Sequence, residues 1–259
     1  MNTQRTALTA SLRAARGFTL VELMVTISIA LFLLGGLVTI LQTVRRTYAS
    51  QQAQVQLQDQ QRFAVTLLTD VIQSGGYFDN PTGDTILSAL PAVAPNFGSG
   101  QAFFGTQGAV LPAAGDTIYV RFRTAPGDGI INCSGSSNAT GIEQVYVNEF
   151  YLNPGTGQLM CVLTTPAGPQ APVPLVSGVA NLQIYYGVKR AVPASDYNVD
   201  TYEQANAMQA SDWDQISSVR VVVTFANPLW GTPNQPVTIP QYITFERVIQ
   251  VMSRAGDYT

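Results

Sequence analysis

The sequence of 259 residues contains no histidine and little charge, since Asp, Glu, Lys and Arg together make up 11% of it. An ordinary soluble domain carries about 25%. Without histidine, Ser-His-Asp and Cys-His catalytic sets, imidazole metal ligands and a histidine pH switch are excluded. The 16 acidic residues outnumber the 13 basic ones, which argues against the basic face that a nucleic-acid-binding protein needs. A histidine-based enzyme and a nucleic-acid-binding protein are therefore not expected.

The charge at the N-terminus has one sign. The first 17 residues contain Arg5, Arg13 and Arg16 but no acidic residue, and an apolar run from Phe18 to Leu41 follows at once. As a helix this run is about 36 Å long, which suffices to cross a hydrocarbon core of about 30 Å. By the positive-inside rule, we expect the first residues to stay in the cytoplasm and the chain after Leu41 to be exported.

A cleaved secretory signal peptide is the competing interpretation of this run. Such a peptide has an apolar region of about 7 to 15 residues, followed by small residues at the cleavage point. Here the longer run is followed by Gln42-Thr43-Val44-Arg45-Arg46, and no cysteine lies near it to carry a lipid. The sequence therefore predicts a single transmembrane helix that is kept in the mature protein.

Glu22 is the one charged residue inside the apolar run. A carboxylate near the centre of a membrane helix costs about 2.5 to 3.5 kcal/mol unless it is paired. Two interpretations are open: Glu22 lies near the interface and reaches headgroup water, or it has a partner.

The segment Gly17-Phe18-Thr19-Leu20-Val21-Glu22-Leu23-Met24-Val25-Thr26 resembles the prepilin processing site of type IV pilins and type II secretion pseudopilins. The resemblance implies that a membrane prepilin peptidase cuts between Gly17 and Phe18 and then methylates the new amine of Phe18. A glycine before the cut leaves the backbone open to the protease. In a filament, Glu22 would then pair with the N-terminal amine of a neighbouring subunit and set the axial register.

The chain after Leu41 indicates a long amphipathic helix followed by strands. Residues 42–76 continue the helix, with an apolar stripe of Phe63, Leu67, Leu68, Val71 and Ile72 that should dock on a sheet, and Gly75-Gly76 ends it. Seven short apolar or alternating runs then predict strands; they are residues 117–122, 144–147, 150–152, 159–163, 182–186, 219–225 and 243–249. Asn153–Gly157 has the composition of a hairpin turn.

These elements define the expected organisation. The fold class is α+β and pilin-like, with a long N-terminal helix packed on an antiparallel sheet. We expect a leader at residues 1–17, a transmembrane or filament-core helix at 18–41, an amphipathic continuation at 42–76 and a periplasmic β domain at 77–259. Residues 78–115 and 190–215, the latter with Tyr197, Tyr202 and Trp213, are expected to be long surface insertions rather than sheet.

Only two cysteines are present, which suits one disulfide and is too few for a zinc cluster. Cys133 and Cys161 would close a loop of about 29 residues in an oxidising periplasm, worth about 3 kcal/mol. A reactive thiol is the alternative, but no histidine or lysine lies close in sequence to lower a thiol pKa. We therefore expect the two cysteines to be paired.

Further segments resemble the PilW family of minor pilins, relatives of the J-type pseudopilin of type II secretion. They are Asp70–Tyr77, Val176–Val179 with Leu182–Gly187, Trp213–Ile216 with Val219–Val221, and Phe245–Val251. Two positions depart from the family pattern: Phe78-Asp79 stands where a Gly-Cys pair is expected, and Ser253-Arg254 where Arg-Asn is expected.

The PilW resemblance implies a minor pilin that primes type IV pilus assembly at the inner membrane and then sits at or near the pilus tip. The implied partners are other minor pilins, the major pilin, the prepilin peptidase, the inner-membrane assembly platform and a tip adhesin. A J-type pseudopilin of a secretion system is the alternative.

An exported enzyme is the remaining alternative. Asp212 and Asp214 flank Trp213 and suggest a sugar site with two carboxylates or a calcium loop. Acids separated by one residue in a loop are usually solvated, and neither the carboxylate spacing nor a twelve-residue calcium pattern is met. Asn138-Ala139-Thr140 matches a glycosylation acceptor but is expected to be an ordinary turn. No catalytic residue, cofactor or metal is therefore expected.

Overall fold

The computed structural model describes residues 17–109, 115–190, 198–232 and 238–254. The chain divides into two compact units, Met1–Gln52 and Ala53–Thr259. Helix α1 runs from Leu20 to Gln73 without a break and contributes to both.

The first unit consists, in its described part, of the N-terminal portion of α1. Every residue from Gly17 to Ala49 is exposed, including the apolar ones; Phe18 and Phe32 have more than four-fifths of their surface exposed. Hydroxyl groups that fall within the helix donate to carbonyl oxygens one turn earlier, as Ser28 does to Met24 and Thr39 to Gly35. The side-chain polar groups are thereby satisfied within the helix, which suits an apolar surrounding.

The second unit begins with the C-terminal portion of α1, whose buried face is made of Leu57, Ala64, Leu67, Leu68, Val71 and Ile72. The expected apolar stripe is therefore largely present, with one correction. Phe63 is 53% exposed and lies outside the buried face, because Ala64 is the residue that points into the core at that turn.

Two glycines end α1. Gly76 has φ of +76°, a conformation that favours glycine, and its N–H donates to the carbonyl of Arg121. A Cβ at Gly75 would lie 2.2 Å from the ring of Phe103. The expected stop at Gly75-Gly76 is thus fixed both by backbone conformation and by close packing on the first strand.

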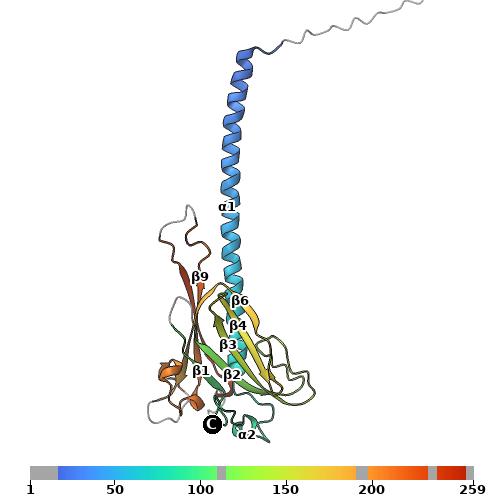
Figure 1. The fold of residues 1–259 in the computed structure, drawn as a ribbon, viewed down its shortest axis with the longest axis vertical. Coiled ribbons are helices and arrows are strands. Elements are labelled where there is room, and N and C mark those ends of the chain that lie inside the picture. The colour runs from blue at the N-terminus through green and yellow to red at the C-terminus, as the bar shows by residue number, and fades with distance from the viewer. Residues whose placement is uncertain (1–16, 110–114, 191–197, 233–237, 255–259) are drawn as a thin grey trace, which may run out of the picture. The chain divides into compact units, whose positions relative to one another are not determined.

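Two antiparallel sheets follow, where the sequence predicted one (Figure 1). The first has the order β1-β2-β3-β4-β5, with β6 also paired to β4; its strands are β1 Phe103–Thr106, β2 Thr117–Thr124, β3 Gln144–Asn153, β4 Gln158–Thr165, β5 Gly168–Pro169 and β6 Val173–Ser177. The second has the order β10-β9-β7-β8; its strands are β10 Tyr242–Gln250, β9 Ser218–Ala226, β7 Val179–Val188 and β8 Thr201–Glu203.

The β3–β4 hairpin turns where its composition predicted. The N–H of Gly157 donates to the Asn153 carbonyl over 2.9 Å, and the Asn153 side chain accepts from the N–H of Gly155 over 3.0 Å. Gly157 has φ of +61°. The runs at 144–147 and 150–152, which read as two strands, form the single strand β3.

The segments expected to be surface insertions contain regular structure. Residues 78–115 include the short helix α2, Ile86–Ala89, and strand β1, while residues 190–215 include β8 and the 3-10 turns η1, Ala205–Ala207, and η2, Trp213–Gln215. Leu90 and Phe103 are buried in the common core with α1 and both sheets. The expectation that these segments lie outside the sheets is therefore wrong for β1, which does not alternate between apolar and polar residues, and for β8, which has a single apolar residue.

Candidate assembly site

The candidate site at the N-terminus starts with three residues that precede the helix. Gly17, Phe18 and Thr19 are exposed and non-helical, and α1 begins at Leu20. A Cβ built on Gly17 would meet no atom of the described residues within 4 Å. The chain itself therefore does not require a glycine at position 17, so a requirement for one would come from whatever binds this segment.

Glu22 has a hydrogen-bond partner within the same chain. The Thr19 N–H and hydroxyl both donate to Glu22 Oε2, over 3.0 and 2.9 Å, and the Glu22 N–H lies 3.3 Å from the Thr19 hydroxyl oxygen. This reciprocal arrangement is a capping box, which satisfies N–H groups at a helix start that have no partner inside the helix. The spacing Thr-x-x-Glu is its sequence signature, which was not recognised from the sequence.

The capping box changes the interpretation of Glu22. Its carboxylate is held in the subunit by Thr19, so a second subunit is not needed to give it a first partner. Both hydrogen bonds to the carboxylate reach Oε2, and no hydrogen bond to Oε1 occurs within the described part of the chain. One carboxylate oxygen thus fixes the helix start while the other stays available.

The apolar surface that follows the capping box is continuous. Among the described residues, one helix, α1, is long and apolar enough to span a membrane by its length and composition. No residue in its apolar membrane-spanning stretch is buried. Such a surface needs lipid or other apolar helices around it.

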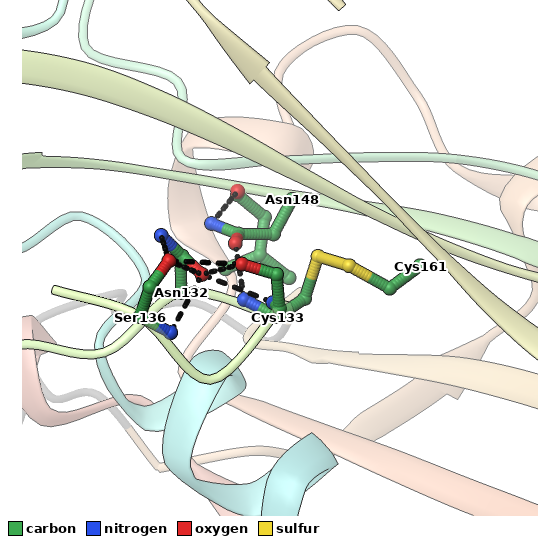
Figure 2. Close-up of a disulfide and its surroundings, with 7 residues drawn as sticks. Asn132, Cys133, Ser136, Asn148 and Cys161 are labelled. Carbon is green, nitrogen blue, oxygen red and sulfur yellow. Dashed lines mark hydrogen bonds between the residues drawn. A yellow bond between two sulfur atoms is a disulfide. The ribbon is translucent and has the colours of Figure 1, made fainter. Parts of the chain in front are cut away.

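The disulfide Cys133–Cys161 is present, with the two Cα atoms 5.9 Å apart, and both cysteines are fully buried (Figure 2). It joins the loop between β2 and β3 to strand β4. The Asn148 side chain accepts the N–H of Cys133 over 2.8 Å, and the Asn132 side chain accepts from the N–H groups of Ser134 and Ser136. The loop is thus held on the sheet covalently and by buried amides.

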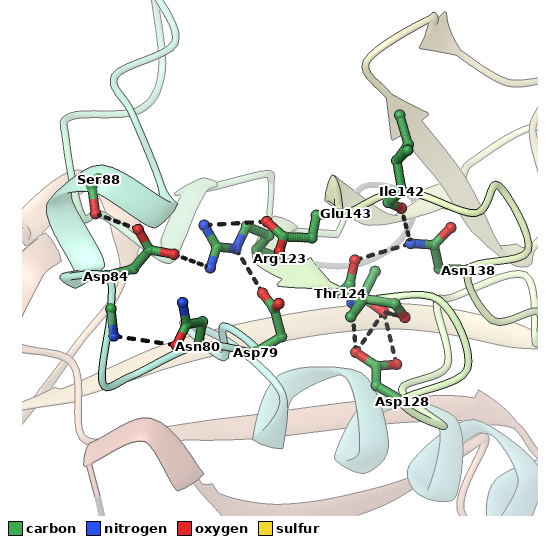
Figure 3. Close-up of polar contacts among 12 residues, drawn as sticks. Asp79, Asn80, Asp84, Ser88, Arg123, Thr124, Asp128, Asn138, Ile142 and Glu143 are labelled. Atoms are coloured by element: carbon green, nitrogen blue, oxygen red, sulfur yellow. Dashed lines mark hydrogen bonds and ion pairs between the residues drawn. The ribbon is translucent and has the colours of Figure 1, made fainter.

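An ion-pair cluster around Arg123 holds the segment that follows α1 (Figure 3). Arg123 contacts Asp79 over 2.8 Å, Asp84 over 2.5 Å and Glu143 over 3.7 Å. Burial opposes the charge of Arg123, but hydrogen bonds to Asp84 and Asp79 outweigh it and raise its pKa. Asp79 stands where the family resemblance places a cysteine, so an ion pair ties this segment to β2.

Arg121, one pleat earlier on β2, is fully buried and forms no ion pair among the described residues. Its guanidinium donates instead to the backbone carbonyls of Leu90, Pro91, Gly98 and Gln101. Burial lowers the pKa of Arg121 to about 10. Neither Arg121 nor Arg123 was singled out from the sequence, and their alternation with Val120 and Phe122 was the only available signal.

The acidic pair at 212 and 214 does not form the solvated loop that was expected. Asp212 is 8% exposed, lies 2.7 Å from Arg190 and also accepts the N–H of Gln209, whereas Asp214 is exposed. Trp213 packs on Tyr186 with ring centroids 5.0 Å apart. Across the described ranges, no group of three or more Cys, Asp or Glu residues is arranged to hold a metal ion.

The remaining candidate positions have structural roles. Tyr202 is half-buried and its hydroxyl lies 2.8 Å from that of Ser218, so it is not freely exposed as expected. Tyr197 lies outside the described residues. Asn138 donates from its amide to the carbonyls of Thr124 and Ile142, which agrees with a role in the turn.

The exposed apolar helix behind a Gly-Phe-Thr-x-x-Glu segment, continued into a domain of antiparallel sheets, defines a pilin-like protein. Residues 12–38 match the prokaryotic N-terminal methylation motif. Residues 145–253 match the family described as type IV pilus-assembly protein W. These two matches, together with the fold, support a PilW-type pilin.

The chain was also compared with solved structures and with curated proteins. Among solved structures, the chain is similar to a type IV-like pilin, TTHA1219 from Thermus thermophilus, with 16% sequence identity, 75% of this chain and 95% of that chain covered, and a TM-score of 0.43. A comparison with curated proteins found no match.

Proposed function

We propose that this protein is a minor pilin that takes part in priming type IV pilus assembly and sits at or near the pilus tip. The observation that carries the proposal is that the exposed apolar portion of α1, up to Ala49, is joined to a second unit that extends over residues 53–259. A unit of that size is too bulky to repeat along a fibre with tightly packed helices, whereas an end position leaves one side without a neighbour.

Maturation follows from the N-terminal segment. Prepilin peptidase removes residues 1–17, cuts between Gly17 and Phe18, and methylates the amine of Phe18. Loss of three arginines shifts the formal net charge from −3 to −6 and removes the charges that held the chain at the cytoplasmic face. Residues 18–41 then anchor the protein in the inner membrane and later enter the filament core, with residues 42–76 continuing the helix and residues 77–259 forming the periplasmic domain.

Glu22 supplies the assembly contact. Oε2 stays in the capping box with Thr19, and Oε1 accepts the Phe18 amine of a neighbouring subunit. A carboxylate with one oxygen already held loses less side-chain freedom when it pairs, and the pair offsets the cost of burying both charges. Glu22 acts by position and not as a catalyst, and the protein is not an enzyme.

The proposed partners are those that act on a pilin or assemble with it. They are other minor pilins, the major pilin, the prepilin peptidase, the inner-membrane assembly platform and a tip adhesin. The protein needs no cofactor for these contacts and binds no nucleic acid.

Deletion of the gene tests the proposal. Pilus number, counted by electron microscopy, should fall strongly while the major pilin is still made and processed. Gold labelling of sheared pili with an antibody against the exported domain should mark ends. Unaltered pilus number would contradict the priming role, even labelling along the shaft would contradict the tip position, and loss of protein secretion with normal pili would favour the J-type pseudopilin.

A further inference from the structure

Strand β10 lies at one end of the second sheet and, among the described strands, pairs only with β9. Its nine residues pair with β9 in unbroken register from Tyr242 to Gln250. Long unpaired edges are usually blocked by charged side chains, proline or a bulge. Between residues 242 and 250, β10 has no lysine, proline or bulge, and its two charged residues are Glu246 and Arg247.

The hydrogen bonds at its two ends show which residues face outward. Asn227 donates to the carbonyl of Gln241, and Val251 donates to that of Ser217. Antiparallel strands alternate between hydrogen-bonded and non-hydrogen-bonded pairs, so the odd-numbered residues of β10 bond to β9. The N–H and C=O groups of the even-numbered residues, from Tyr242 to Gln250, point to the outer side, where the described residues provide no backbone partner.

The core-facing side chains of β10 are incompletely covered. Odd-numbered residues of β9 are buried, and the same face continues on β10 through Ile243 and Phe245, which are half-buried. Arg247 follows on this face, is exposed and forms no ion pair among the described residues. A strand added at this edge would cover the two apolar side chains and place a residue next to Arg247.

We propose that the outer edge of β10 receives an extended strand from a second, different pilin-type subunit, with apolar residues beside Ile243 and Phe245 and an acidic residue beside Arg247. The inference rests on the proposed function, because that function supplies pilin-type neighbours. Main-chain hydrogen bonds provide the affinity of such strand addition and alternate side chains its specificity.

A second copy of this chain fits the edge less well. The centre of β10 is Glu246, so full-length antiparallel pairing of two copies places Glu246 opposite Glu246. Like charges directly opposite each other destabilise a strand pair. An acidic residue next to Arg247 would be favourable, and a second β10 in that register does not place one there.

Photo-crosslinking in cells that assemble pili tests the proposal on the full chain. A crosslinking residue at Thr244, whose side chain is exposed, should give an adduct with a subunit that carries its own N-terminal methylation motif. The crosslinked peptide should alternate apolar residues and contain an acid. The same residue at Arg62, on the exposed side of α1, is the position control. An adduct with a second copy, or no adduct, overturns the proposal.

Two variants separate an edge contact from a general effect. Val248→Pro removes an outward N–H without touching a bond to β9, and should lower the Thr244 adduct at least tenfold, whereas Val248→Thr keeps the N–H and the adduct. Arg247→Glu should lower it similarly and be rescued by a basic residue at the partner's acid. Folding of each variant is checked by its urea midpoint. If the proline variant does not fold, the Arg247→Glu variant alone tests the edge contact. An unchanged adduct overturns the edge contact, while the deletion phenotype tests the priming role independently.

Discussion

Replacing Arg121 by methionine should destabilise the domain more than any exposed substitution of the same kind. Methionine has similar length and fills the space, but it offers no donor. The change would leave the carbonyls of Leu90, Pro91, Gly98 and Gln101 without the guanidinium. It would also remove the cation from the face of Phe97, where it lies 4.7 Å from the ring centroid.

The magnitude follows from these lost contacts. The carbonyls of Leu90 and Gly98 keep backbone donors, the N–H groups of Gly100 and Gln101, so among the described residues only the carbonyls of Pro91 and Gln101 lose every donor. A carbonyl left without a partner costs about 1 to 3 kcal/mol, and two of them at the lower value give about 2 kcal/mol. Removing a buried charge returns part of its desolvation cost, which is why the lower value is used. Arg121→Lys should cost less, since it keeps the charge and one or two of the bonds but lacks the planar fork.

The assay is urea unfolding of the detergent-solubilised chain, followed by tryptophan fluorescence. Arg62→Met, on the exposed side of α1, is the matched control and should change the unfolding free energy by about 0.5 kcal/mol or less. Limited proteolysis should cut the Arg121→Met variant first within residues 86–101. A loss below about 1 kcal/mol, the size of a single net hydrogen bond, would show that water replaces the guanidinium and would refute the argument.

Four other outcomes are expected. Gly17→Leu should leave the precursor uncut, which intact mass of the membrane-extracted protein measures; a normal mature mass would contradict it. Glu22→Gln should be processed but enter filaments poorly, as scored by its amount in sheared pili; wild-type incorporation would exclude a role for the charge. Replacing Cys133 and Cys161 by serine should cost about 3 kcal/mol of unfolding free energy, and reductant should have no further effect on that variant. Burial, with a nearby carboxylate, raises the pKa of Tyr119 to about 12; because the unfolded chain ionises near pH 10, stability should fall by about 1 kcal/mol between pH 9 and 11, and fall less in Tyr119→Phe.

The sequence predicted those elements in which a hydrophobic pattern extends over several residues of the element itself. The apolar run and the stripe ending at Ile72 predicted α1, and alternation predicted β2, β7, β9 and β10 within a few residues of their bounds. β1 and β8 escaped because Phe103–Thr106 does not alternate between apolar and polar residues and Thr201–Glu203 has a single apolar residue. They are strands because Phe103 packs under Gly75 and because Tyr202 pairs with Gly187, and both contacts depend on distant parts of the chain.

The candidate site shows the same division between local and distant information. The Thr19-x-x-Glu22 spacing was readable, since a capping box is a property of four consecutive residues. It was missed because the apolar surroundings of Glu22 suggested a missing partner rather than a helix start. The proposed second partner of Glu22, the Phe18 amine of a neighbouring subunit, belongs to another chain and therefore cannot be predicted from this spacing.

Strand β2 shows why burial of the charged face could not be predicted. Ile118, Val120 and Phe122 alternate with Tyr119, Arg121 and Arg123, which is the pattern of a sheet with one buried and one solvated face. The second face is buried as well, because the segment after α1 folds over it and gives each arginine different partners: carbonyls for Arg121 and carboxylates for Arg123. The cost of burying two cations is offset only when that segment is in place. Folding of residues 78–102 and burial of the β2 face are therefore one event, which sequence periodicity within β2 cannot reveal.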